Sequence, residues 1–232
     1  MTLTEHLTEL RRRVLVSVTA FVVAATVAFL GYNWILAGLK HPYCQVAPTH
    51  CGFYVTGPLD GLALRIKIAA YGGIFLASPV WLWELWRFIT PGLNPREKKY
   101  AVPFIVATIG LFTLGATVAF LIFPHALAWL DSIGGPSLNQ ILDPNKYLSL
   151  IILLMVAFGV TFEFPVLLVS LELAGVLTPQ QLSSWRRWAI IGIVVLAGVI
   201  TPSSDPFSML AMAVPLYVFY ELSILIGKIA RR

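Results

Sequence analysis

The chain has 232 residues and a formal net charge of +5, with 58% apolar and only 12% charged side chains. A soluble domain carries about a quarter charged residues, so this composition excludes an ordinary soluble protein and leaves no room for a separate soluble domain. The basic residues lie in short clusters between apolar runs, without a basic arm or face, which argues against nucleic acid as a partner.

Apolar segments long enough to cross a bilayer follow one another along the chain. A membrane-spanning helix needs roughly 20 mainly apolar residues. The first segment starts after Arg13 and is far longer than the ~7–15-residue core of a signal peptide, so we expect it to remain as an anchor. The sequence predicts one all-α integral membrane domain, residues 1–232, with spans at about 14–39, 62–89, 100–123, 147–176, 185–200 and 206–229.

Several spans have unusual features. Pro124 closes the third span, and the fourth is about 30 residues long, so we expect it to tilt, bend or protrude. The fifth has only 16 residues, which predicts local thinning of the bilayer. Four full spans plus a re-entrant hairpin are the alternative, and both arrangements leave the two termini on the same side.

The distribution of basic residues predicts which side that is. Of the 16 lysines and arginines, 12 lie before the first span, in the second-to-third and fourth-to-fifth connections with the span ends that flank them, or in the tail with the end of the last span. Positive residues concentrate on the cytoplasmic side. We therefore expect a multi-pass inner-membrane protein with both termini in the cytoplasm, cytoplasmic loops at 90–99 and 177–184, and exported loops at 40–61, 124–146 and 201–205.

Both cysteines, Cys44 and Cys51, lie in the first exported loop. In an oxidising compartment this spacing favours a small disulfide, with two free thiols as the next interpretation. His41 and His50 flank the pair, but the spacing matches no standard zinc pattern, so a metal site ranks last. No cofactor is expected.

Glu163 is the most conspicuous acidic residue, because it lies inside the fourth span. A membrane-embedded carboxylate is costly and is a functional candidate by default. Pro165 follows it, removes a backbone donor and bends the helix. Glu163 must face protein, water or a partner, or be protonated. A structural hydrogen bond between helices is the alternative.

Other acidic residues lie near the predicted cytoplasmic face. Glu84 precedes Arg87 by one turn, which predicts an i,i+3 ion pair. Glu9 belongs to a short amphipathic segment, 3–10, and Glu97 to a tight basic loop. From the residues alone, both read as surface charges paired locally, Glu9 with Arg13 and Glu97 with its neighbouring lysines.

Three stretches carry a resemblance to a known family. They are HLTELRRR at 6–13, ASPVWLWELWRFITPGLNPREKK at 77–99 and AFGVTFEFP at 157–165. In this order, and on the predicted sides, they resemble TatC, the receptor subunit family of the twin-arginine protein translocase. The resemblance runs from about residue 4 to 230 and implies six spans in a cupped arrangement, with short fifth and sixth spans.

The resemblance implies a role for the cytoplasmic carboxylates. In the family, two of them receive the paired arginines of a signal peptide on folded cargo, and they match Glu9 and Glu97. Guanidinium is planar, permanently charged and forms forked bonds to carboxylate, so lysine is a poorer ligand. Phe88 and Leu93 match positions lining the same site, and Arg11 matches an arginine that would orient Glu9.

The resemblance also implies partners. Glu163 matches a glutamate on the cupped face where the single-span partners TatA and TatB would dock, and a response to the proton-motive force is the alternative role. Other copies of the chain and the lipid bilayer are further expected partners. Asp205 belongs to an exported-side motif that departs from the family pattern by one extra residue and a missing glutamine. Arg96 stands where the family often has histidine.

Two other classes of membrane protein fit the sequence less well than a translocase receptor. An intramembrane protease is disfavoured because all four histidines lie outside the spans and there is no GxSxG motif. A small-solute secondary transporter is the stronger alternative, since Pro79 and Pro165 could mark broken helices, but no internal repeat supports it. The resemblance therefore implies a non-enzymatic receptor that binds twin-arginine signal peptides and, with TatA and TatB, supports proton-motive-force-driven export.

Overall fold

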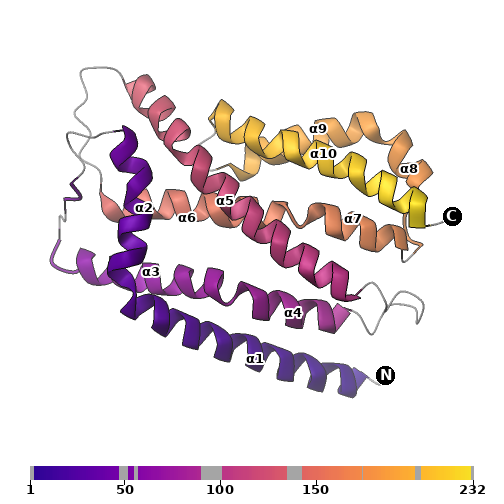
Figure 1. Ribbon diagram of the computed structural model, residues 1–232, viewed down its shortest axis with the longest axis horizontal. Coiled ribbons are helices and arrows are strands. Elements are labelled where there is room, and N and C mark those ends of the chain that lie inside the picture. Colours follow the sequence, from indigo (N-terminus) through magenta and orange to yellow (C-terminus); the bar gives the residue numbers. More distant parts are fainter. Residues whose placement is uncertain are drawn as a thin grey trace. The chain divides into compact units, whose positions relative to one another are not determined.

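The computed structural model describes residues 3–46, 52–54, 57–89, 101–134, 143–173, 175–201 and 205–230. These residues form α-helices and their connections, and no strand occurs among them (Figure 1). The helices group into two compact units, 1–40 with 55–109 and 41–54 with 110–232. Helices α2 and α5 each begin in the first unit and end in the second.

The first unit is built on one long helix. Helix α1 packs along both α3 and α4, beside which it runs in Figure 1. The helices with residues in this unit are α1 (Leu3–Leu30), α2 (Tyr32–Val46), α3 (Asp60–Leu76), α4 (Ser78–Ile89) and α5 (Ala101–Gly134).

Helix α1 differs from the predicted first span at both ends. It begins at Leu3, so the amphipathic segment 3–10 and the apolar run form one continuous helix. It ends at Leu30, where the prediction had the span continue to Leu39. Gly31 separates it from α2, and the Gly31 carbonyl accepts the Ile35 N–H at 3.2 Å as the first bond of the new helix. Glycine loses more backbone freedom in a helix than other residues, which favours a break here.

Helices α3 and α4 correspond to the predicted second span, and they meet at a bend of 51°. Ala77 lies at the bend, and Pro79 occupies the first turn of α4, where its missing N–H is tolerated. Before the bend, α1 and α3 approach closely. A Cβ atom on Gly73 would lie 2.8 Å from the Ala25 Cβ, so only glycine allows this contact.

The second unit is organised around the last helix. Helix α10 packs against α7, α8 and α9. Large aromatic side chains fill the interior of the unit, among them Phe112, Phe123 and Phe158. The helices that lie wholly in this unit are α6 (Pro144–Thr161), α7 (Phe164–Leu173), α8 (Pro179–Ser184), α9 (Arg186–Ile200) and α10 (Pro206–Ala230).

Two prolines of this unit, Pro124 and Pro165, differ in whether the helix around them is interrupted. Helix α5 continues through Pro124 to Gly134, although the sequence predicts that Pro124 closes the span. A membrane helix tolerates such a proline because neighbouring groups satisfy the freed carbonyl. Pro165 does accompany the expected interruption, since α6 ends at Thr161 and α7 begins at Phe164.

Several hydrogen bonds hold residues 175–185, which precede α9. Gly175 adopts a positive φ of 74°, the left-handed conformation that commonly ends a helix. Thr178 and Gln181 then form a reciprocal capping box at the start of α8. The Tyr220 hydroxyl of α10 donates to the Leu182 carbonyl at 2.6 Å, which ties α8 to the last helix.

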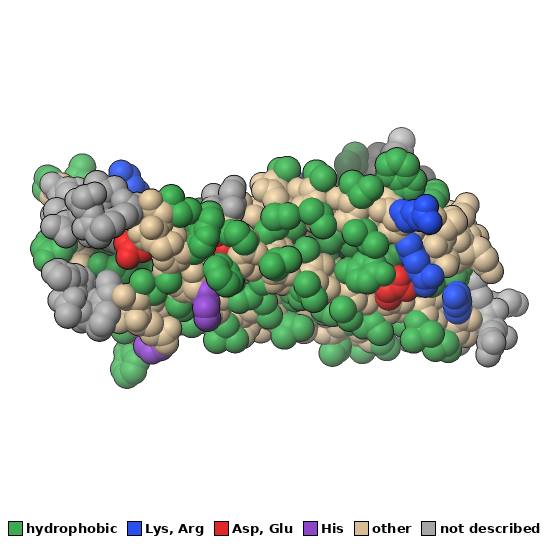
Figure 2. Space-filling model, turned by 90° about the horizontal axis from the view of Figure 1, so that it is seen from above, with side chains coloured by type: hydrophobic (Ala, Val, Ile, Leu, Met, Phe, Trp, Pro, Cys, Tyr) green, Lys and Arg blue, Asp and Glu red, His purple; other side chains and the backbone are tan. Residues whose placement is uncertain are grey.

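Four helical segments in the described residues are long and apolar enough to cross a membrane, and a fifth is added if the bent α3–α4 pair counts as one. Helix α9 has 15 residues and falls short on length alone. Figure 2 shows hydrophobic side chains exposed over most of one face, with charged side chains in a few small groups. The chain is therefore an all-α, multi-pass membrane protein. The long segments are Leu7–Leu30, Val102–Ile133, Pro144–Leu173 and Pro206–Ile229.

Candidate functional site

Two carboxylates and one guanidinium form a cluster where α1 packs against α4. Glu9 and Arg13 lie one turn apart on α1, and the Arg13 Nη2 and Nε atoms donate to Glu9 Oε1, the latter at 3.2 Å. The Arg13 Nη1 atom donates to Glu84 Oε2 of α4 at 3.0 Å. The i,i+4 pair predicted from the sequence is present, and Glu84 joins it across the helix interface. We call Glu9, Arg13 and Glu84 the carboxylate cluster.

The carboxylate cluster is partly withdrawn from solvent and carries excess negative charge. The side chains of Arg13 and Glu84 are each 14% exposed and that of Glu9 is 23% exposed. Two carboxylates around one guanidinium leave a formal charge of −1. Partial burial strengthens charge interactions relative to open water. Such a cluster favours the approach of a further cation that can form hydrogen bonds with carboxylate oxygens.

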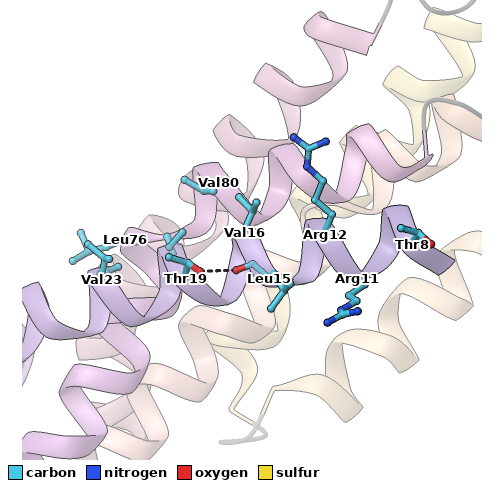
Figure 3. Close-up of a pocket in the computed structure, with 12 residues that line it drawn as sticks. Thr8, Arg11, Arg12, Leu15, Val16, Thr19, Val23, Leu76 and Val80 are labelled. Atoms are coloured by element: carbon cyan, nitrogen blue, oxygen red, sulfur yellow. Dashed lines mark hydrogen bonds between the residues drawn. The ribbon is translucent and has the colours of Figure 1, made fainter. Parts of the chain in front are cut away.

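One expectation for this region is wrong. Glu84 forms its ion pair with Arg13 rather than with Arg87, because α1 brings a guanidinium to it from the neighbouring helix. Arg11, expected to orient Glu9, lines a groove on α1 (Figure 3), and its effect on Glu9 stays a prediction. The side chain that contacts Glu9 is Arg13, since a residue four positions on lies over the same face of a helix. Sequence spacing alone gave no sign of Glu84 as part of the cluster.

The remaining residues of the expected signal-peptide site are described only in part. Phe88 lies on α4 one turn beyond Glu84 and is half-buried. Leu93 and Glu97 lie outside the described residues. Of the five site residues inferred from the resemblance, the structure therefore places Glu9, Arg11 and Phe88, all in the first unit.

Glu163 lies at the break between α6 and α7, inside the apolar segment Pro144–Leu173. Its N–H donates to the Val160 carbonyl at 3.1 Å, a tighter turn than the α-helix makes. Pro165 has no N–H to offer to the carbonyl one turn earlier. The side chain is half-buried, while its neighbour Phe162 is buried and packs edge-on against Phe219 of α10, with ring centroids 5.3 Å apart.

Helix α5 packs very closely beside this break. A Cβ atom on Gly115 would lie 2.6 Å from the carbonyl oxygen of Phe158 and 3.0 Å from the ring of Phe162. The glycine therefore lets α5 approach the last turn of α6, and the aromatic packing holds the break in place. Glu163 thus sits on a fixed corner of the backbone rather than on a loose loop.

Asp205 has a clear structural role. It is fully buried and its Oδ1 accepts the Ser208 N–H at 2.7 Å, while its carbonyl accepts the Met209 N–H at 3.1 Å. These bonds are those of a helix N-cap, here for α10. The exported-side motif expected around Asp205 therefore includes a helix start.

Of the two cysteines predicted to pair, only Cys44 lies within the described residues. Cys44 lies near the end of α2 and is disulfide-bonded, whereas Cys51 and His50 lie outside the described residues, so the pairing itself stays a prediction. Tyr43 beside it is buried and stacks on Phe53, with centroids 5.8 Å apart, and both contact Tyr147 of α6. Burial, followed by the nearby Tyr54 and Asp131, raises the pKa of the Tyr43 hydroxyl.

Two further acidic residues organise α10. Glu221 accepts two bonds from Arg186, from Nε and Nη2, each at 2.8 Å, which links α9 to α10. Glu172 of α7 is buried, and a Cβ atom on Gly227 of α10 would lie 2.5 Å from its carboxylate. Local spacing in the sequence indicates neither contact, because both join helices far apart in the chain.

Comparisons with known proteins agree on one family. The family model for Sec-independent protein translocase protein (TatC) matches residues 5–215. The TatC protein of Frankia casuarinae is 40% identical over all of this chain and 68% of its own length. That of Aquifex aeolicus is 39% identical over all of this chain and 97% of its own. A solved structure described as the twin-arginine translocase receptor TatC is 37% identical, with a TM-score of 0.78, and covers 98% of this chain and 100% of its own.

Proposed function

Because this chain belongs to the TatC family of Sec-independent protein translocase proteins, we propose that the carboxylate cluster forms part of its signal-peptide site. The chain is a receptor subunit of the twin-arginine translocase, and no observation favours a small-solute transporter. The family is one of translocase receptors rather than enzymes. The proposal concerns which side chains of this receptor bind the signal peptide.

The observation that carries the proposal is the guanidinium already held between two carboxylates. Arg13 donates to both Glu9 and Glu84, so the cluster has the geometry that an arginine side chain requires. Counted over its three side chains alone, the cluster has a formal charge of −1, which attracts an arginine from a signal peptide. Arg13 holds the Glu9 carboxylate in place, which lowers the entropy lost when the ligand binds.

The second carboxylate for a twin-arginine ligand is Glu97, carried over from the family resemblance. Two separated carboxylates can each take one of two adjacent arginines, whereas lysine offers a point charge without the fork. Phe88, half-buried one turn beyond Glu84, supplies apolar contact to the ligand beyond its arginines, together with Leu93. This arrangement requires the amino terminus and the 90–99 loop on the cytoplasmic face of the inner membrane.

The proposal extends to the partners of the complex. TatA and TatB, which are single-span proteins, dock on the apolar faces of α9 and α10 and near Glu163. Exposed apolar side chains along both helices, such as Val195 and Val214, support contact with other helices. Glu163 supplies a half-buried polar group at a fixed backbone corner. The assembled complex moves folded cargo at the expense of the proton-motive force.

A capture experiment with precursor proteins tests the signal-peptide site. The full chain in membranes is presented with a precursor carrying twin arginines or twin lysines. We expect capture of the twin-arginine form only, and its loss in Glu9→Gln and Glu97→Gln variants. Asp131→Asn removes an exposed carboxylate elsewhere and is the matched control. Equal capture of both precursors, or undiminished capture by the Glu9→Gln/Glu97→Gln double variant, would contradict the proposal.

A further inference from the structure

An open apolar groove of about 820 Å³ runs along the membrane-spanning part of α1. Its floor on α1 is formed by side chains on one face, among them Leu15, Thr19 and Val23. The opposite wall comes from Leu76 and Val80, on either side of the bend between α3 and α4. All of these residues belong to the first unit (Figure 3).

The groove lies beside the bend between α3 and α4. Before it, α1 and α3 touch through the glycine contact at Gly73, which leaves no space between them. Beyond Leu76 the partner helix turns by 51°, while α1 continues as one uninterrupted helix to the end of the contact. Ala77 at the bend lines the groove, and the small side chains of Ala20 and Ala24 on α1 leave space beside it.

The groove combines an apolar length with a cationic end. The Thr19 hydroxyl donates to the Leu15 carbonyl at 2.8 Å, so the polar atom along the groove is satisfied by its own helix. At the amino-terminal end, the exposed side chains of Arg11 and Arg12 flank the groove. Within the described residues neither arginine takes part in an ion pair, in contrast to Arg13 beside them.

We propose that this groove binds an anionic phospholipid, with an acyl chain along α1 and the phosphate against Arg11 and Arg12. The ligand must be apolar along its length and negative at one end, which describes such a lipid. From Arg12 to Val23 the groove is roughly 16 Å long at 1.5 Å per residue. That length corresponds to one leaflet of a ~30 Å hydrocarbon core, as expected for an acyl chain and too short for a crossing helix.

The charge at the end selects the head group. Basic side chains between or beside membrane helices attract anionic lipids, and each contributes about a fivefold preference near the surface. Phosphatidylcholine has the same acyl chains and phosphate but no net charge, so it gains the apolar contacts alone. The groove is distinct from the carboxylate cluster, because Arg13 faces Glu9 and Glu84 while Arg11 and Arg12 flank the groove.

Native mass spectrometry of the full chain tests the proposal. The purified protein is titrated with phosphatidylglycerol or with phosphatidylcholine of identical acyl chains, and bound lipid is counted. We expect phosphatidylglycerol to be retained preferentially. Arg12→Gln should reduce this preference about fivefold, and Arg11→Gln/Arg12→Gln should remove it. Lys228→Gln, which neutralises an exposed lysine in the last turn of α10, is the matched control and should leave it unchanged.

A second variant tests the apolar part with both arginines intact. Ala20→Phe fills the groove and should displace the tightly bound lipid, whereas Ala107→Phe, at an exposed alanine on α5, should not. Equal retention of the two lipids, or an unchanged preference in the double arginine variant, would overturn the proposal. The proposal would also be overturned if Ala20→Phe lost a dimer peak from the mass spectrum rather than bound lipid, because a second copy of the chain would then be the occupant of the groove.

Discussion

Arg13 of α1 and Glu84 of α4 are joined by an ion pair of 3.0 Å although 71 positions separate them in the chain. This bond ties the helix that carries Glu9 to the helix that carries Phe88. The orientation of one expected ligand of the signal peptide is thus mechanically linked to the position of another. The charge of the site and the packing of α1 on α4 depend on the same side chains.

Replacing Glu84 should affect both properties. In Glu84→Gln the carboxylate cluster loses its excess charge, so we expect capture of a twin-arginine precursor to fall several-fold. The free energy of unfolding should fall by about 1 kcal/mol, the upper range for a partly exposed pair. Binding and thermal unfolding in detergent measure the two effects, with Asp131→Asn as control. A variant with normal capture would separate Glu84 from the site.

A double-variant cycle identifies the pair itself. If Arg13 and Glu84 act through their ion pair, the losses of stability in Arg13→Gln and Glu84→Gln should not add in the combined variant, because either change removes the same bond. The measured quantity is the unfolding midpoint of the four proteins. Strictly additive losses would show that the two residues act independently.

The affinity for a twin-arginine peptide should depend strongly on ionic strength. The Debye length shortens from ~10 Å at about 0.1 M salt to ~3 Å at about 1 M, which screens a ligand cation from partly exposed carboxylates. We expect affinity to decrease about tenfold over this range, as measured by fluorescence anisotropy of a labelled peptide. A twin-lysine peptide should bind weakly throughout, and an affinity that salt does not change would argue for purely apolar recognition.

The close contact of α1 with α3 predicts a sharp effect of one methyl group. In Gly73→Ala the new Cβ would lie 2.8 Å from the Cβ of Ala25, so the helices must separate. We expect a loss of about 1–3 kcal/mol in stability, typical of overpacking. Gly110→Ala is the matched control, because a Cβ there meets no atom within 4 Å. Thermal unfolding of the two variants compares them, and equal midpoints would contradict the close packing.

Two variants of Asp205 distinguish its role as a hydrogen-bond acceptor in the helix cap from the effect of its negative charge. Asp205→Ala removes the acceptor for the Ser208 N–H and should destabilise the protein by about 1 kcal/mol. Asp205→Asn keeps an oxygen in the same place and should retain most of that stability. If Asn were as harmful as Ala in thermal unfolding, the negative charge rather than the cap would be the property that matters.

Much of the fold follows from patterns that are local in the sequence. Helix α9, Arg186–Ile200, lies within one residue of the predicted span 185–200, because Thr201-Pro202 marks its end. The interruption near Glu163 follows from Pro165. Pro124 shows the limit of such reasoning, since the same residue type sits inside a continuous helix there. Whether a proline breaks a membrane helix depends on neighbouring helices, which the local sequence does not contain.

The candidate site could be predicted only in part, for a similar reason. The pair of Glu9 with Arg13 follows from helical spacing. The ion pair of Glu84 with Arg13 and the groove beside the bend at Ala77 both depend on how α1 packs against α3 and α4. The i,i+3 spacing rule therefore gave Glu84 the wrong partner, Arg87. The sequence itself places Glu84 only as an acidic residue near the predicted cytoplasmic face.

The hydrogen-bonded turns at 175–185, before α9, have a practical consequence for mapping this protein. A protease must bind some residues of extended, accessible backbone before it can cut. The positive-φ turn at Gly175, the capping box at Thr178 and the bond from Tyr220 hold this backbone in closed turns. Trypsin should therefore cleave slowly after Arg186 even in vesicles where this face is outward. A fragment that stays uncut at Arg186 would therefore reflect local order, and it would not show on which side of the membrane this face lies.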